Sequence, residues 1–185
     1  MELEMEFVEL AKVSPRILMD IRYATDDNFM GKALYPVSKC YVRKKVAEKL
    51  HRIQEHLEKR ELGLKVWDGY RPLSVQKLFW DLLPDNRYIA NPATGSKHNR
   101  GAAVDVTLVD AYGKELIMPT LFDTFSEKAH RSCMDLPEEA LKNRNLLEMM
   151  MAEEGFIGLP TEWWHFDDAD WKSYPIEDLS LECLG

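Results

Sequence analysis

The sequence has few cysteines, no excess of basic residues and no long apolar run. Its three cysteines, Cys40, Cys133 and Cys183, are odd in number and widely spaced, which excludes a disulfide framework. We expect all three to be buried structural thiols. The 24 Lys and Arg face 32 Asp and Glu, and the resulting net charge of -8 argues against a protein that binds nucleic acid.

Targeting and membrane signals are also missing. No stretch is long enough to span a bilayer, so we expect no membrane partner. Residues 1–10 carry four glutamates where a signal peptide would have an apolar run. The sequence therefore predicts a cytoplasmic protein, or a periplasmic one if a signal peptide had been removed.

What is present is an ordinary globular composition. The 185 residues are 45% hydrophobic and 30% charged, with no internal repeat and no low-complexity tract. A chain of this length buries one core without disulfides or structural metals, since single cores rarely split below about 250 residues. We expect one domain that spans residues 1–185.

Hydrophobic periodicity predicts a mixture of helices and strands. Apolar residues recur at helical spacing over 41–62, with Gly63 as the stop, and we expect further helices at 73–83 and 137–154. Strands are predicted at 17–23, 64–67, 102–109 and 161–167. Because the order lacks a regular β-α-β rhythm, the pattern favours the α+β class, with helices packed on a central antiparallel or mixed sheet.

Two segments carry the residue types of a catalytic zinc site. Such sites use three protein ligands, usually His and carboxylate, and leave a position for water. His98 stands before a predicted strand, Asp105 lies within that strand, and His165 lies in the last predicted strand. Glu162 precedes His165 by three residues, where a general base for the attacking water is wanted.

Structural alternatives exist for each of these residues. A lone His is more often a satisfied polar group than a metal ligand, and spacing alone leaves the metal site at even odds. Asp105 is harder to explain structurally, because burying a carboxylate without a partner is costly. The Trp163–Trp164 pair is typical of a core or a pocket wall.

Four motifs occur in one order along the chain. Residues 96–105 match Ser-x-His-x-x-Gly-x-Ala-x-Asp, and residues 162–165 match Glu-x-Trp-His. Residues 67–72 read Trp-Asp-Gly-Tyr-Arg-Pro, and residues 22–31 contain Arg-Tyr-Ala-Thr followed by Asn-Phe-x-Gly. Together they resemble the D-alanyl-D-alanine dipeptidases of the VanX type, within the zinc DD-peptidase/hedgehog-like group.

The resemblance implies a fold and an activity. The fold would be one α+β domain with a central sheet flanked by helices and zinc in the cleft. The activity would be zinc-dependent hydrolysis of the D-Ala-D-Ala dipeptide by a metal-activated water, with one Zn²⁺ per chain. Such an enzyme would degrade cell-wall precursors, either in glycopeptide resistance or in recycling.

The resemblance also assigns roles to eight residues. His98, Asp105 and His165 would bind zinc, and Glu162 would be the catalytic base. Arg71 would stabilise the oxyanion. Asp123 would help to hold the free ammonium of the substrate, and Tyr23 and Ser96 match positions that contact the substrate.

Alternatives remain for individual residues and for the activity. Arg71 could simply pair with Asp68 at a helix start, and Asp123 could cap a helix near Thr124 or Ser126. The short stretch between Arg71 and residue 98 predicts a more open cleft than in relatives with an insertion there. A zinc D,D-carboxypeptidase acting on longer peptides is therefore one alternative, and a non-catalytic zinc module that binds peptides is another.

Overall fold

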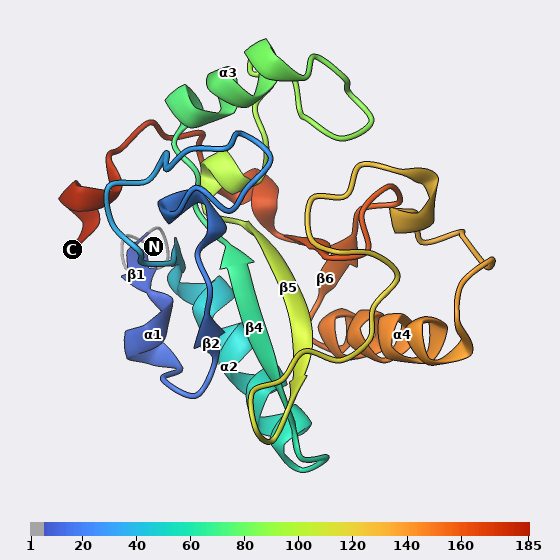
Figure 1. The fold of residues 1–185 in the computed structure, drawn as a ribbon. Helices are drawn as coiled ribbons and strands as arrows, with labels where there is room; N and C mark the ends of the chain where they lie inside the picture. Colours follow the sequence, from blue (N-terminus) through green and yellow to red (C-terminus); the bar gives the residue numbers. More distant parts are fainter. Residues whose placement is uncertain (1–5) are drawn as a thin grey trace.

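The computed structural model describes residues 6–185, and its centre is a five-stranded mixed sheet (Figure 1). The strand order is β2-β4-β5-β7-β6. β2 runs parallel to β4, and the other neighbours are antiparallel. The strands are β2 (Leu18–Met19), β4 (Leu62–Asp68), β5 (Ala103–Asp110), β6 (Phe156–Gly158) and β7 (His165–Asp168). The predicted α+β class with a mixed sheet is confirmed.

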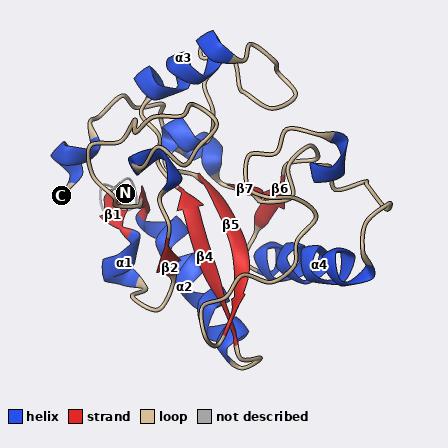
Figure 2. Ribbon diagram, in the orientation of Figure 1, coloured by secondary structure: helices blue, strands red, loops and turns tan. Residues whose placement is uncertain are grey.

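Helices cover the sheet and its edges. α2 (Lys44–Glu58) lies behind β4 in Figures 1 and 2 and turns Leu50, Ile53 and Leu57 into the core. α4 (Glu138–Glu153) runs beside β6, and α3 (Leu73–Leu82) lies above the upper ends of β4 and β5. The remaining elements are α1 (Leu10–Val13), the pair β1 (Phe7–Glu9) and β3 (Tyr41–Arg43), and single 3-10 turns at Arg22–Ala24, His98–Arg100, Glu127–Ala129, Trp171–Ser173 and Leu181–Leu184.

The predicted helix over 41–62 is too long at both ends. Its first residues form β3, which pairs with β1, and α2 ends at Glu58. Gly63 is not the stop, because it lies inside β4. The reversal is made by Glu61, whose φ of 57° lies in the left-handed region. Gly63 is instead needed for packing, since a Cβ there would lie 3.0 Å from Gln54 Nε2.

Two predicted strands are also shorter than expected. In the segment 17–23, only Leu18–Met19 pairs with β4, and Arg22–Ala24 form a 3-10 turn. In the segment 161–167, the strand begins at His165. The backbone N–H of Trp163 bonds to the carbonyl of Ala129 instead of a neighbouring strand, so this part of the chain turns before it joins the sheet. Alternation of apolar residues could not reveal such loop contacts.

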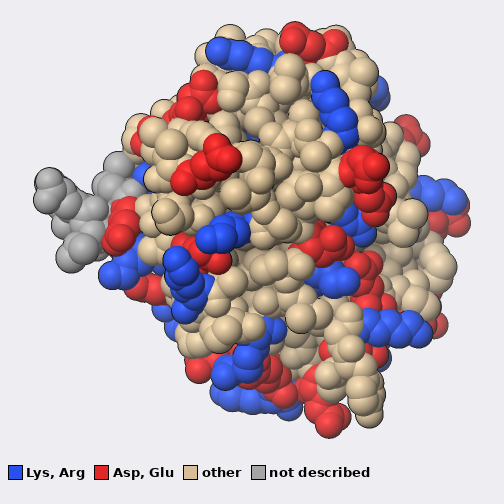
Figure 3. All heavy atoms as spheres, turned by 60° about the vertical axis from the view of Figure 1, so that its left-hand side comes forward, with Lys and Arg blue, Asp and Glu red and all other residues tan. Residues whose placement is uncertain are grey.

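The cysteines differ from the prediction in their exposure. All three are free, but only Cys40 is buried, whereas Cys133 is half-buried and Cys183 is exposed. Among residues 6–185, no helix is long and apolar enough to cross a membrane. On the face shown in Figure 3, Lys and Arg side chains are interspersed with Asp and Glu. Such mixing on this face is typical of a solvated surface.

Candidate metal centre and active site

Strand pairing brings the three predicted ligands together. Asp105 on β5 lies directly opposite His165 on β7, so their side chains leave the same face of the sheet. His98 reaches them from the 3-10 turn before β5. That turn ends at Gly101, with φ of 68°, and a Cβ there would lie 2.3 Å from the Phe7 ring. Only glycine fits this position, so the turn that carries His98 can pass close to Phe7 of β1.

The three donor atoms surround one point. His98 Nε2 lies 3.3 Å from Asp105 Oδ1, His165 Nδ1 lies 3.2 Å from the same oxygen, and the two nitrogens are 3.2 Å apart. Zinc–ligand bonds of 2.0–2.2 Å in a tetrahedron imply ligand–ligand distances of about 3.3 Å. The Asp105 Oδ1 atom is buried and has no hydrogen-bond partner within residues 6–185. The donor set and the unpaired oxygen therefore fit a zinc ion.

Each imidazole is held by a hydrogen bond at the ring nitrogen that faces away from the other ligands. His98 Nδ1 lies 2.7 Å from the carbonyl oxygen of Gly69, so this nitrogen carries the proton and leaves Nε2 free for a metal. His165 Nε2 lies 2.7 Å from Asp167 Oδ1, which likewise leaves Nδ1 free. These partners fix the ring orientation and raise the basicity of the ligating nitrogens.

The electrostatics of the metal-free site favour a cation. Burial alone would lower the pKa of His165, but the carboxylates of Asp167 and Asp105 raise it to about 10. Burial alone would raise the pKa of Asp105, but His98 and His165 hold it below its ordinary value. The site thus keeps its carboxylate ionised and draws a positive charge to the point where a metal would sit.

Glu162 stands next to this point from the turn before β7. Its Oε2 lies 3.8 Å from His165 Nδ1, and the residue is only 5% exposed. Burial raises the pKa of Glu162 well above its ordinary value, opposed in part by the neighbouring His165. A buried carboxyl group with a raised pKa holds a proton more readily than an exposed one, as a general acid–base group must.

Arg71 forms the predicted pair with Asp68, and it also lies at the cavity. Its guanidinium donates to Asp68 Oδ2 from Nε at 3.1 Å and from Nη2 at 2.8 Å, and to Gln76 Oε1 from Nη1. It also lines the cavity beside the metal centre, with Nη2 3.9 Å from Asp105 Oδ2. Although burial would lower its pKa, Asp68 and Tyr23 raise it, so Arg71 stays charged.

Asp123 faces the cavity and does not cap a helix. It is hydrogen-bonded by the hydroxyl of Tyr23, and its φ of 55° is unusual for a residue other than glycine. Burial, together with the charge of Asp105, raises the pKa of Asp123 to about 8. Ser96 lines the same cavity, and its hydroxyl oxygen accepts a hydrogen bond from the backbone N–H of His98.

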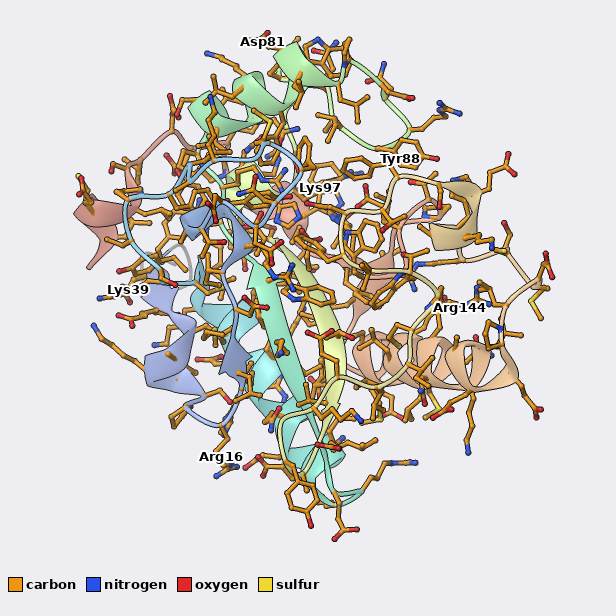
Figure 4. All side chains as sticks on the ribbon, viewed as in Figure 1. Arg16, Lys39, Asp81, Tyr88, Lys97 and Arg144 are labelled. Carbon is orange, nitrogen blue, oxygen red and sulfur yellow. The ribbon has the colours of Figure 1, made fainter. Side chains whose placement is uncertain are left out.

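All eight predicted site residues line one cavity of ≈ 180 Å³. Despite the short connection after Arg71, residues 86–90 wall this cavity on one side. Figure 4 shows Tyr88 extending from that loop. Its hydroxyl lies 3.2 Å from His130 Nε2, and its ring packs 5.3 Å from the ring of Phe125. The loop is therefore tied to the segment that carries Asp123.

Several supporting residues were not predicted as functional. Asp68, the carboxylate that holds Arg71, was considered only as a structural partner. Asp167 and Gln76 were not singled out at all. Asp167 could have been found, because it stands two residues after His165 and thus on the same face of a strand. Tyr88 and Gln76 carry no such signal, since their contacts arise only from folding.

Comparisons with known proteins agree with this geometry. Residues 3–180 match the D-ala-D-ala dipeptidase family of M15 peptidases. The chain is 36% identical over 179 residues to a D-alanyl-D-alanine dipeptidase of Escherichia coli (strain K12), covering 97% of this chain and 93% of that protein. It is 32% identical to a D-alanyl-D-alanine dipeptidase of Enterococcus faecalis, and the match covers 94% of this chain and 96% of that protein. The fold resembles VanYB in complex with D-alanine-D-alanine (TM-score 0.50, 14% identity, 76% of this chain and 78% of that one).

Proposed function

Because the chain belongs to the D-ala-D-ala dipeptidase family of M15 peptidases, we propose that it hydrolyses the D-Ala-D-Ala dipeptide with one zinc ion per chain. The observation that carries the proposal is the set of three ligand atoms 3.2–3.3 Å apart, with Glu162 and Arg71 on the same cavity. His98, Asp105 and His165 would hold the zinc. The ion would supply a Lewis acid that polarises the scissile carbonyl and lowers the pKa of water.

Glu162 is the proton carrier of this proposal. Its carboxylate accepts a proton from the attacking water and then delivers it to the leaving amine of the second alanine. Burial suits it to this task, because the raised pKa lets the protonated form persist until the amine accepts the proton. The position 3.8 Å from His165 Nδ1 places it within reach of a water beside the metal centre.

Arg71 and Asp123 would bind the charges of the substrate and of the transition state. Arg71 stays ionised and is held rigidly by Asp68, so it can face the oxyanion without reorganising, a contribution commonly worth about 3 kcal/mol. Asp123, with Tyr23 beside it, would accept the free ammonium of the dipeptide. Ser96, which lines the same cavity, would donate a hydrogen bond to the substrate.

The family favours a dipeptidase over a carboxypeptidase. Residues 86–90 line the cavity of ≈ 180 Å³, and the Tyr88 contacts with Phe125 and His130 join them to the segment that carries Asp123. The non-catalytic alternative leaves Glu162 without a role, since binding alone needs no buried proton carrier.

The test is hydrolysis of D-Ala-D-Ala by zinc-loaded protein, beside N-acetyl-D-Ala-D-Ala and the Glu162→Gln variant. We expect cleavage of the free dipeptide only, and a loss of at least 100-fold in kcat in the variant, as general acid–base catalysis is worth about 10²–10⁴-fold. Glu148→Gln, an exposed acid on α4, is the matched control and keeps full activity. Equal cleavage of the acetylated peptide would identify a carboxypeptidase. A metal content far from one zinc per chain, or no cleavage of either peptide, would refute the proposal.

A further inference from the structure

One buried side chain, Asn99, joins the turn that carries His98 to the loop that carries Arg71. Asn99 is fully buried, and its Nδ2 donates to the carbonyl oxygen of Arg71 at 2.8 Å. Its Oδ1 accepts a hydrogen bond from the backbone N–H of Ser96 at 2.7 Å. One amide group therefore contacts the backbones of two residues that line the cavity of the candidate active site.

Backbone hydrogen bonds around Asn99 complete this junction. The backbone N–H of Arg71 donates to the carbonyl of His98 at 3.1 Å, so both main-chain polar groups of Arg71 are bonded to the same turn. The carbonyl of Asn99 accepts from the N–H of Glu177 at 2.8 Å, and the carbonyl of Glu177 accepts from the N–H of Leu73 at 3.2 Å. The C-terminal segment thus connects the turn to the start of α3.

An amide satisfies both contacts of this side chain. The carbonyl of Arg71 requires a donor and the N–H of Ser96 requires an acceptor, and asparagine offers one of each in a single planar group. An aspartate at position 99 would keep the acceptor but would direct a second oxygen at the Arg71 carbonyl. An apolar residue would leave both backbone groups unpaired, which is costly for buried groups.

We propose that Asn99 is a positioning residue that sets the place of Arg71 relative to His98, and so to the metal centre. This inference rests on the proposed roles of Arg71 and His98. The guanidinium itself is oriented by Asp68 and Gln76, whereas Asn99 holds the backbone from which that side chain extends. Because Arg71 would act on a charge that develops only in the transition state, its displacement lowers kcat more than it raises KM.

The first test compares Asn99→Asp and Asn99→Ala in zinc-loaded protein with D-Ala-D-Ala as the substrate. Asn99→Asp loses the bond to Arg71 and keeps the bond to Ser96. We expect its kcat to fall about 10–100-fold with little change in KM, since a misplacement of about 1 Å can cost about 100-fold in rate. Asn99→Ala loses both bonds, so its KM should rise as well. The matched control is Asn143→Asp, because Asn143 is 8% exposed and its Nδ2 donates to the carbonyl of Ile117, outside the cavity.

Zinc affinity separates a positioning role from general damage to the site. We expect the variants to bind zinc as tightly as the wild type in a chelator competition, because His98 keeps its hydrogen bond to the carbonyl of Gly69. If Asn99→Asp does not fold, Asn99→Ser, which leaves room for a water, is measured in its place with the same expected fall in kcat. A fall in kcat that comes with an equal loss of zinc affinity, or that the control matches, would overturn the inference.

The second test needs no turnover. Cobalt(II) replaces zinc, and the paramagnetic shift of the Arg71 Nε–H signal, assigned with Arg71→Lys, reports by NMR where the guanidinium lies relative to the metal. We expect this shift to change in Asn99→Asp and to stay the same in Asn143→Asp. Either an unchanged shift or a wild-type kcat in Asn99→Asp overturns the inference. If the wild-type protein does not cleave the dipeptide, the proposed function fails, and the shift alone decides whether Asn99 positions Arg71.

Discussion

The buried pair of Asp68 and Arg71 provides a prediction of stability that can be worked out from the contacts. Asp68 is fully buried and Arg71 is 6% exposed. Asp68 accepts two hydrogen bonds from the guanidinium, at 2.8 and 3.1 Å, and a third from the hydroxyl of Tyr35 at 2.7 Å. Asp68→Asn keeps the shape of the side chain but leaves the guanidinium without its counter-charge.

The expected decrease in the free energy of unfolding follows from the burial of both partners. Removing one member of a buried ion pair costs about 3–5 kcal/mol, because the other charge remains away from water. The amide oxygen of Asn still accepts one hydrogen bond, so we expect a loss near the lower end, about 3 kcal/mol. Since small domains have a total stability of about 5–15 kcal/mol, Asp68→Asn removes a large share of it.

The assay is urea unfolding with a chelator present, so that metal binding does not contribute. A lower midpoint with an unchanged m-value is expected. Asp85→Asn is the matched control, because Asp85 and Arg87 form the same kind of pair at the surface, and we expect no measurable loss there. A loss in Asp68→Asn as small as that of the control would refute the reasoning. So would a double variant Asp68→Asn/Arg71→Met that is less stable than Asp68→Asn alone, since removing both charges should restore stability.

Three further predictions concern the metal, the pH and the loop. Asp167→Asn should weaken zinc binding about 10–100-fold in a chelator competition, because it frees the ring of His165, and an unchanged affinity would contradict the role of this hydrogen bond. In metal-free protein, His165 has a pKa of about 10 and Asp123 a pKa of about 8, so both hold protons that the unfolded chain releases. The free energy of unfolding, measured in urea, should therefore fall from pH 6.5 to pH 8, and a rise would contradict this reasoning. Tyr88→Ala, which removes the contact with His130, should raise KM for D-Ala-D-Ala more than it lowers kcat, and equal effects on both would exclude a wall function.

The sequence predicted the elements whose signal is local. The helix predicted at 137–154 is an example. Pro137 precedes α4 and Gly155 follows it with φ of 81°, so residues next to the helix mark both of its ends. The end of α2 could not be predicted in this way. Glu61 takes the left-handed conformation that glycine usually provides, and Gly63 is reserved for close packing against Gln54. At these two positions the tertiary structure overrides the local conformational preferences of glutamate and glycine.

The proposed metal ligands and the proposed base Glu162 could be chosen from residue types, order and resemblance, because they lie in short motifs. The groups that hold these side chains in place could not all be found from the sequence in this way. The carbonyl of Gly69 that fixes His98 and the hydroxyl of Tyr35 that supports Asp68 come from distant segments. A backbone carbonyl has no sequence signature, so only the fold shows it. The sequence thus predicts which atoms react better than it predicts what orients them.

Charge balance explains why the site suits a metal ion as well as its arginine. Asp105, Asp123 and Glu162 line one cavity and Asp68 holds Arg71 beside it, so the positive charges of Arg71 and of protonated His165 face four carboxyl groups. Burial, with a smaller effect of the neighbouring carboxylates, raises the pKa values of Asp123 and Glu162, so both groups bind a proton more readily than an exposed carboxyl group. A divalent cation would lower these pKa values, since a bound ion is the largest charge in its site. Zinc binding at the proposed ligands would therefore be linked to proton release, and it would also prepare Glu162 for its proposed role of accepting the proton of the attacking water.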